Sequence, residues 1–219
     1  SLAVTFPLAI LLALLLNEVK CNKFKRVVQT VSYLPHFLSA VIVCGMVRQL
    51  LTVDGGLVNT IINAFGGEPI YFLGSTRFYR TYYVASGVWQ SIGWSSIVYL
   101  AAMGNIDTSL YEAAELDGAG IIKKMWYVTL PALLPIISIT LILQVGSLLS
   151  VGHEKTLLLY STLNYEVSDI ISTYVYREGL VGMQYSYTAA VDLFTSVVNL
   201  VLVLSCNWAA KKMGQEGVW

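Results

Sequence analysis

The chain has 219 residues, of which 56% are hydrophobic and 12% charged, and its 13 basic and 13 acidic residues give a formal net charge of zero. A soluble domain carries about twice that charged fraction. These values exclude a disordered protein and a single soluble globule, and the scattered basic residues exclude the one-sided footprint of a nucleic-acid-binding protein.

The charged residues are distributed very unevenly along the chain. Five stretches contain no Asp, Glu, Lys or Arg, and together they cover 110 residues: 1–17, 27–47, 81–106, 125–152 and 193–210. All charges therefore fall in the remaining half, at the density of an ordinary soluble surface. The three cysteines show neither disulfide nor metal-ligand spacing, and two of them lie inside charge-free stretches.

The charge-free stretches predict membrane-spanning helices, because about 20 helical residues cross a hydrocarbon core of about 30 Å. We expect an all-α, polytopic membrane bundle with five such helices: 2–17, 27–50, 81–104, 128–151 and 188–210. Proline at positions 35, 131 and 135 predicts kinks in the second and fourth helices. A kink can accompany a transport path, although proline is also common in membrane helices generally. The chain begins inside an apolar stretch without Met, so we expect an N-terminal truncation.

Basic residues in the connecting segments predict the orientation. Eight of them lie on one side: Lys20, Lys23, Lys25, Arg26, Lys123, Lys124, Lys211 and Lys212. The other side has five, spread over longer loops, so the positive-inside rule places the first side in the cytoplasm. Loop 18–26, loop 105–127 and the C-terminus are then cytoplasmic, in a plasma membrane.

The cytoplasmic segment 105–127 contains a short helix of its own. Ser109 and Glu112 have the spacing of a capping box, and Gly118 and Gly120 follow as a stop signal. Leu110, Ala113, Ala114 and Leu116 supply a small apolar face. A helix of two to three turns is too short to be stable alone in water, so it needs a partner surface.

Two partners are open for this helix. Its small alanines would let another protein approach closely, with Glu112, Glu115 and Asp117 giving polar register at the rim. It could instead lie on the membrane surface, but such a helix normally carries Lys or Arg on its polar face and large apolar residues on the other. The composition favours docking to a protein.

The same segment resembles a known family signature. Glu112-Ala113-Ala114, three residues, Gly118, nine residues and then Val128-Thr129-Leu130-Pro131 is similar to the EAA motif of permease subunits of binding-protein-dependent ABC importers, with Val128 in place of the usual Ile. Further matches resemble the LplB-type polysaccharide permeases, which have a MetI-like fold: Asn17-Glu18, Gln29 to His36, Asp54 to Asn59, Asp117 to Gly120, Thr173 to Arg177 and Gly214 to Trp219. One departure is Thr108, where the family often has Pro.

The resemblance implies that residues 1–219 form one transmembrane domain, with a sixth helix preceding it in the full chain. It implies an ATP-driven importer in which two related permeases pair, a cytoplasmic ATPase dimer docks on the EAA segment, and an extracytoplasmic binding protein delivers a sugar or oligosaccharide. The ATPase-coupling residues are expected to be Ser109, Glu112, Ala113, Ala114, Asp117 and Gly118.

The chain contains no Gly-x-x-x-x-Gly-Lys-Ser/Thr sequence, so it lacks a P-loop. We therefore expect this chain to bind no cofactor and to be a transport subunit rather than an enzyme. ATP and Mg²⁺ are expected to be used by the partner ATPase.

Polar side chains inside the apolar stretches follow helix faces. We expect a substrate path at Gln90, Trp94, Gln144, Ser147 and Asn199, because amides, hydroxyls and a flat aromatic ring suit a neutral sugar. The alternative is that these groups hydrogen-bond between helices, at about 0.6–2 kcal/mol each. The outer segments 51–80 and 152–187 are rich in tyrosine, which fits either a landing surface for a binding protein or an aromatic belt at headgroup depth.

Two other function classes remain as alternatives. An ion-coupled carrier or channel would need ionisable residues within the membrane, and only Asp192 comes close. An intramembrane enzyme is a remote alternative, because His-Glu-x-x-His, Gly-x-Ser-x-Gly and paired mid-helix aspartates are all missing.

Overall fold

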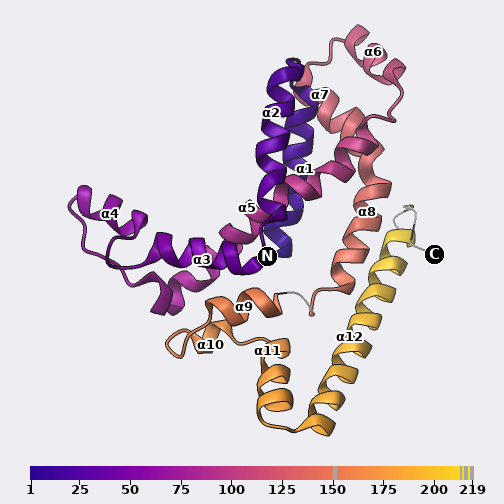
Figure 1. The fold of residues 1–219 in the computed structure, drawn as a ribbon. Helices are drawn as coiled ribbons and strands as arrows, with labels where there is room; N and C mark the ends of the chain where they lie inside the picture. The colour runs from indigo at the N-terminus through magenta and orange to yellow at the C-terminus, as the bar shows by residue number, and fades with distance from the viewer. Residues whose placement is uncertain (150–151, 213, 215–216, 218–219) are drawn as a thin grey trace. The chain divides into compact units, whose positions relative to one another are not determined.

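The computed structural model describes residues 1–149, 152–212, 214 and 217, and in them every regular element is a helix. Figure 1 labels the α-helices: α1 (Leu2–Glu18), α2 (Asn22–Tyr33), α3 (Ala40–Leu51), α4 (Leu57–Ala64), α5 (Thr76–Met103), α6 (Thr108–Leu116), α7 (Ile121–Lys124), α8 (Leu130–Gly146), α9 (His153–Leu159), α10 (Tyr165–Ser168), α11 (Ile171–Val175) and α12 (Tyr185–Lys212). Two 3₁₀ turns, η1 (Leu34–Phe37) and η2 (Phe72–Gly74), and two π-helical segments, η3 (Met125–Thr129) and η4 (Tyr176–Val181), complete the fold.

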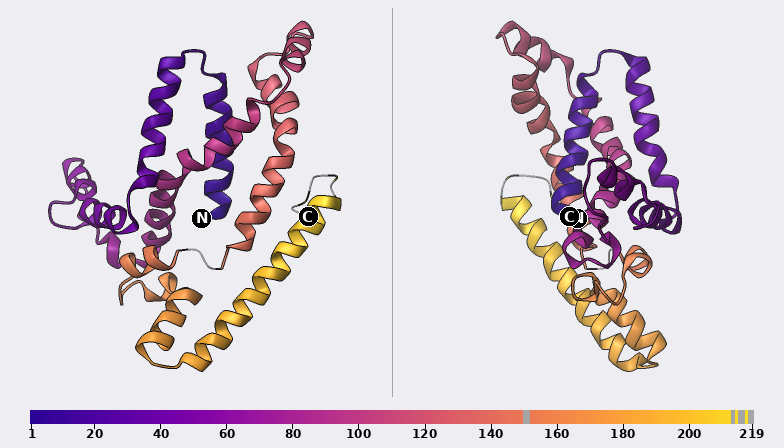
Figure 2. Two further views of the ribbon diagram at one scale, coloured as in Figure 1. Left: turned by 45° about the vertical axis from the view of Figure 1, so that its right-hand side comes forward. Right: turned by 90° about the vertical axis from the view of Figure 1, so that its left-hand side faces the viewer.

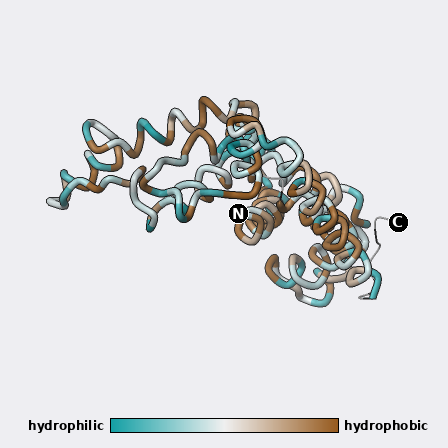
Figure 3. Tube along the Cα trace, turned by 90° about the horizontal axis from the view of Figure 1, so that it is seen from below, coloured by the Kyte–Doolittle hydropathy of each residue, from teal (hydrophilic) through white to brown (hydrophobic). Residues whose placement is uncertain are grey.

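The chain divides into two compact units. Unit 1 comprises Ser1–His36, Ser91–Leu148 and Asn199–Trp219, and unit 2 comprises Phe37–Gln90 and Leu149–Val198. In unit 1, α1 and α2 form an antiparallel hairpin, which both views in Figure 2 show. Figure 3 shows apolar residues along the helices and shorter polar stretches between them.

The core of unit 1 lies where α1, α5 and α8 meet. Small residues of α1, Ala9 and Ala13, are almost fully buried against Tyr99 and Met103 of α5 and Leu133 of α8. The Tyr99 hydroxyl lies 3.1 Å from the Thr140 hydroxyl, so its polar end has a partner inside the apolar surroundings. The alanines let α1 approach α5 closely, which is how membrane helices commonly pack.

A second close approach in unit 1 joins α2 to α5 at Gly93. A Cβ atom at this position would overlap the backbone carbonyl of Ser32. One turn away, the rings of His36 and Trp94 stack with centroids 4.5 Å apart and planes 2° from parallel. Any residue larger than glycine at position 93 would therefore force α2 and α5 apart.

Unit 2 is held together by polar contacts around a tyrosine cluster. Tyr79 and Tyr82 are buried with Cys44 and Leu159, and Asn164 donates to the carbonyl of Leu73 at 2.9 Å. The ammonium of Lys155 donates to the Tyr83 carbonyl at 3.0 Å and lies 4.8 Å from the centre of the Tyr83 ring. Burial lowers the pKa of Lys155 to about 8, because the apolar surroundings disfavour its charged form.

Each of the five segments that the sequence predicts as spanning contains helix in its described residues, but the five differ as spans. By length and composition, two helices in the described residues can cross a membrane, Ile121–Gly146 and Tyr185–Lys212. The helix at 2–17 is α1, which has 17 residues. The helix at 81–104 is the 28-residue α5, whose many Tyr, Ser, Gly and Trp residues make it less apolar. The end of 128–151 lies outside the described residues at positions 150 and 151.

The prediction of one continuous helix over 27–50 is wrong. The segment consists of α2, η1 and α3, and its two halves are bent by 101°. Pro35 has no N–H and cannot form the α-helical hydrogen bond to the carbonyl four residues earlier, and the chain there continues as the 3₁₀ turn η1 before the break at Leu38 and Ser39. Ser39 then caps α3 by accepting from the Ile42 N–H at 3.3 Å, and Gln90 donates to the freed Leu38 carbonyl at 3.0 Å. The kink expected from Pro35 is thus a complete break.

Candidate functional site

The cytoplasmic segment predicted from the sequence is a well-defined helix in unit 1. Helix α6 begins one residue before Ser109, and its N-cap is Asp107, whose carboxylate accepts from the Ser109 N–H at 2.9 Å. The prediction that Ser109 is the N-cap is therefore wrong: aspartate two residues earlier accepts the first-turn hydrogen bond. This hydrogen bond lowers the pKa of Asp107, and the negative charge favours the helix N-terminus.

The C-terminus of α6 ends as the sequence predicts. Gly118 has a φ of +73°, in the left-handed region that glycine adopts without strain. The Ala119 N–H donates to Ala114 O at 2.9 Å and the Gly118 N–H to Glu115 O at 3.0 Å, which together form a Schellman motif. Space around Gly118 is open, so its conformation and not crowding selects glycine.

Helix α6 has no buried residue, although it carries apolar side chains. Leu116 is 91% exposed and Leu110 is 51% exposed. Glu112, Ala113 and Gly118 are exposed as well, and Ala114 is partly exposed. The apolar face is therefore available to a partner surface.

Two polar contacts hold α6 to the segment that follows it. Lys124 Nζ lies 2.6 Å from Glu115 Oε1, and the Tyr111 hydroxyl lies 3.0 Å from that of Thr129, a fully buried residue of η3. The hydrogen bond from Lys124 holds the pKa of the Glu115 carboxyl below its ordinary value. The carboxylate is thus ionised at neutral pH, and α6 has a fixed relation to the start of α8.

The π-helical segment η3 connects α7 to α8. A π turn contains one residue more than an α turn and often marks a functional position. Pro131 lies two residues after η3 and has no N–H, so the regular α-helical hydrogen bond cannot form there. Pro135 lies inside α8, and a kink at these two prolines stays a prediction.

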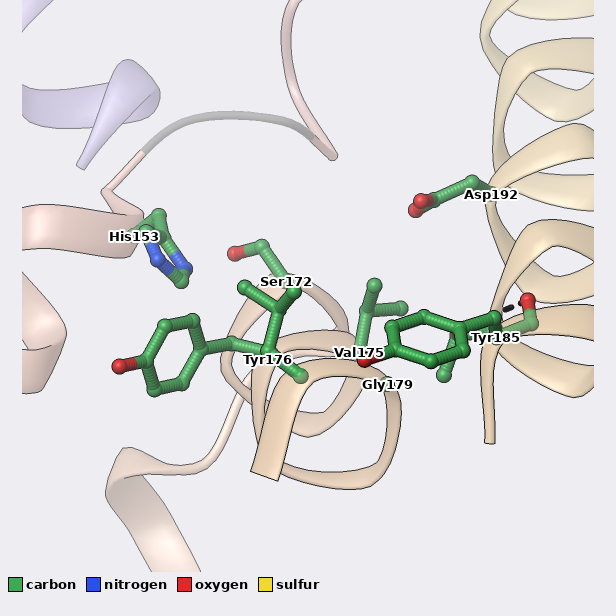
Figure 4. A pocket seen from close by; sticks show the side chains of 9 residues that line it. His153, Ser172, Val175, Tyr176, Gly179, Tyr185 and Asp192 are labelled. Atoms are coloured by element: carbon green, nitrogen blue, oxygen red, sulfur yellow. Dashed lines mark hydrogen bonds between the residues drawn. The ribbon is translucent and has the colours of Figure 1, made fainter. Parts of the chain in front are cut away.

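Unit 2 contains a hollow that was not predicted from the sequence (Figure 4). It has a volume of about 330 Å³ and is lined by His153, Ser172, Val175, Tyr176, Gly179, Leu180, Tyr185, Thr188 and Asp192. The Ser172 hydroxyl is buried and has no hydrogen-bond partner among the described residues. Two tyrosine rings, an imidazole and a carboxylate surround the space, which is a suitable lining for a hydroxyl-rich ligand.

Of this set, the sequence analysis named Asp192 as an ionisable residue and counted Tyr176 among the aromatic residues of the outer segment 152–187. His153, Ser172 and Tyr176 come from three short helical segments, α9, α11 and η4, whereas Tyr185 and Thr188 come from the start of α12. Close approach of η4 to α12 brings them together, because buried Gly179 has no side chain and leaves room for Thr188. In the sequence, the signal for this contact is the spacing of Gly179 from Thr188, and that signal is weak.

At least three of the five residues expected to line a substrate path have partners inside the protein. Gln90 donates to Leu38 O, Trp94 stacks on His36, and the Ser147 hydroxyl donates to Gln144 O at 3.2 Å. Asn199 Oδ1 is a buried atom of α12. Gln90 belongs to unit 2, whereas Trp94, Gln144, Ser147 and Asn199 belong to unit 1. Their role in substrate contact stays a prediction.

Comparisons with known proteins all point in one direction. Residues 5–215 match the family described as "Binding-protein-dependent transport system inner membrane component". The chain is 49% identical to the polygalacturonan/rhamnogalacturonan transport system permease protein YteP of Bacillus subtilis and 44% identical to protein LplB of the same organism, over its whole length and 68% and 69% of those proteins.

Solved structures agree with these relatives. A chain of the bacterial alginate ABC transporter, in complex with an alginate pentasaccharide-bound periplasmic protein, superposes with a TM-score of 0.97 at 42% identity. The superposition covers 100% of the present chain and 76% of that chain.

Proposed function

Because the chain belongs to the family of binding-protein-dependent transport system inner membrane components, it is a membrane permease, and we propose that it imports an oligosaccharide. The observation that carries the transport assignment is α6: a short helix, capped at both ends, tied by two polar contacts and exposed along its apolar face. Such a helix suits the groove of another protein.

The ATPase is proposed to be a separate chain that docks on α6. Glu112, Ala113 and Ala114 supply the exposed surface, Asp107, Asp117 and Gly118 fix its ends, and Ser109 lies in its first turn. ATP and Mg²⁺ would bind to that ATPase, because the present sequence contains no P-loop. We propose that loop 18–26, segment 105–127 and the C-terminus lie on the cytoplasmic side, as the distribution of basic residues favours.

A second permease is proposed to pair with this one. Only 6% of the apolar part of α12 is buried, and Leu193 and Phe194 are 71% and 68% exposed. Such a surface needs lipid or another membrane helix to cover it. One of the alginate transporter structures is a complex with an alginate pentasaccharide-bound periplasmic protein, which supports delivery of the solute by a binding protein from the extracytoplasmic side.

The saccharide class is supported by the relatives and by the hollow in unit 2. YteP is named for polygalacturonan and rhamnogalacturonan, and the solved neighbours transport alginate. Tyr176 and Tyr185 offer aromatic faces, and the Ser172 hydroxyl has an unused hydrogen-bonding capacity. A sugar could stack on the former and bond to the latter.

The test is uptake of radiolabelled oligosaccharides by proteoliposomes that contain the permease pair, the ATPase and the binding protein. Uptake is expected to require ATP and the ATPase, and Ser172→Ala and Tyr185→Ala are expected to raise the half-saturating concentration. Tyr71→Ala changes an exposed tyrosine that does not line the hollow and serves as the control. Uptake driven by an ion gradient without ATP would instead support an ion-coupled carrier.

A further inference from the structure

Two hollows adjoin each other at the start of α8, and they differ in chemistry. The first, of about 270 Å³, is lined by apolar side chains of α1 and η3 together with Leu130: Pro7, Ile10, Leu11, Leu14, Met125 and Trp126. The second, of about 400 Å³, is lined by Ile122, Lys123, Trp126 and Tyr127. Trp126 lines both, so an apolar groove opens beside a basic and aromatic one. All of these residues belong to unit 1.

The apolar groove follows one face of α1. Pro7, Ile10, Leu11 and Leu14 are spaced by three or four residues, so they form a stripe about 10 Å long. That length and volume accommodate part of one extended acyl chain. The opposite wall is formed by Met125, Trp126 and Leu130, where the π turn spreads the side chains.

The basic hollow contains an available cation. Lys124 is bound to Glu115, whereas its neighbour Lys123 is exposed and forms no ion pair among the described residues. Trp126 and Tyr127 beside it are 63% and 80% exposed. Tryptophan and tyrosine are enriched at headgroup depth, and a lysine near an anionic lipid surface contributes about 1 kcal/mol to the attraction.

We propose that these two hollows form one site for an anionic phospholipid, with an acyl chain along α1 and the headgroup phosphate at Lys123. The occupant is a lipid because a cation and two interfacial aromatic rings meet the open end of a purely apolar groove. A partner helix would need no charge at that end. The site rests on the membrane location of the permease but not on the identity of its solute.

The site adjoins the segment that holds α6. Met125 and Trp126 belong to η3, and buried Thr129 at the end of η3 lies within 3.0 Å of the Tyr111 hydroxyl of α6. A lipid in this position would contact the short segment that links α6 to α8. Lipid composition could then affect the transporter where the two segments are joined.

The experiment uses the assembled transporter in nanodiscs that contain phosphatidylglycerol or phosphatidylcholine brominated on the acyl chains. Quenching of Trp126 is obtained as the difference between the wild-type complex and Trp126→Phe. We expect brominated phosphatidylglycerol to quench Trp126 with about a fivefold preference, the factor that corresponds to about 1 kcal/mol. Lys123→Gln should remove the preference, and Leu11→Phe, which fills the groove, should reduce quenching by both lipids.

Lys20→Gln is the matched control, because it removes one exposed basic charge from the α1–α2 connection without altering the site. It should keep the preference. Equal quenching by the two lipids, or a preference that survives in Lys123→Gln, would contradict the proposal. Absence of quenching by either lipid would show that protein covers the groove and would also overturn it. None of these readouts requires transport, so they stay interpretable if the saccharide assignment fails.

Discussion

Nζ of Lys124 lies 2.6 Å from Oε1 of Glu115, and this ion pair connects the last residue of α7 with the last turn of α6. Glu115 is largely exposed, so the pair adds little to global stability. Its effect is geometric: it fixes the direction of α6 relative to the chain that enters α8.

Reversing this pair tests its geometric role. Glu115→Lys is expected to leave expression and thermal unfolding unchanged but to lower uptake several-fold per ATP hydrolysed, because α6 loses one of its two attachments. The double variant Glu115→Lys with Lys124→Glu should restore coupling. The measurement is the ratio of solute imported to ATP hydrolysed in proteoliposomes. A double variant no better than the single one would show that the charges act separately.

Gly118 offers a test of backbone conformation. Gly118→Leu is expected to abolish ATPase docking, because a branched side chain at a φ of +73° costs about 1–3 kcal/mol and distorts the end of α6. Gly118→Asn should retain much of the docking, since asparagine tolerates this region. Co-purification of the ATPase and uptake are the readouts.

Gly66→Leu is the control for Gly118→Leu, because Gly66 also has open space and a positive φ, +80°, but lies between α4 and η2. It should leave ATPase docking intact. Loss of docking in Gly118→Asn but not in Gly66→Leu would indicate that the ATPase approaches Gly118 too closely for any side chain. Normal docking in Gly118→Leu would contradict the assigned role of α6.

Gly93 tests the close approach of α2 to α5. Gly93→Ala places a methyl group against the Ser32 carbonyl and is expected to destabilise the permease by about 1–3 kcal/mol, as overpacking generally does. The midpoint of thermal unfolding should fall. Gly45→Ala in α3, where no atom lies within 4 Å of the added methyl group, should be neutral or stabilising. If Gly93→Ala and Gly45→Ala had equal midpoints of thermal unfolding, this result would contradict the close approach of α2 to α5 at Gly93.

Lys155 predicts a pH dependence of stability. Its pKa is lowered by burial from an ordinary 10.5 to about 8, so the unfolded chain binds more protons between these values and stability rises with pH in that window. The effect is at most about 3 kcal/mol and smaller after solvent screening. Thermal midpoints measured from pH 7 to pH 10 would show the rise.

Lys155→Met is expected to remove this rise and to keep or increase the midpoint at pH 7. The Tyr83 carbonyl lies inside α5, so the regular helical hydrogen bond from the backbone N–H four residues later remains to it in the variant. Replacing a buried charge by an apolar side chain is often neutral or stabilising. If Lys155→Met instead lost much stability at pH 7, the contacts of the Lys155 ammonium with Tyr83 would contribute more than burying that charge costs.

The sequence predicts much of this fold because charge-free length and glycine chemistry are local properties. The position of α12 and the end of α6 at Gly118 follow from them directly. The break at Pro35 was predictable as a kink, but the Leu38 carbonyl at the break is satisfied by Gln90, which lies over fifty residues away in sequence. The N-cap at Asp107 was missed because Ser109 and Glu112 matched a stronger local pattern.

The hollows could not be predicted from the sequence, for a different reason. His153, Ser172 and Tyr185 lie on separate elements, and the packing of η4 against α12 helps to bring them together. Likewise, Leu11 and Trp126 face the same groove although more than a hundred residues separate them. Periodicity identifies the face of one helix but not the helix that it meets.

The π turn of η3 contains one residue more than an α turn, and this residue sets the rotation of α6 and α7 relative to α8. An α-helix advances about 100° per residue, so deleting one residue from Met125–Thr129 and restoring α-helical geometry would rotate α6 and α7 by about that angle relative to α8. The Lys124–Glu115 ion pair lies within the rotated part and would be kept, whereas Tyr111 of α6 would point away from Thr129 at the end of η3. The extra residue thus sets the angle at which α6 is presented, and a motor pulling on α6 would act on α8 through that angle.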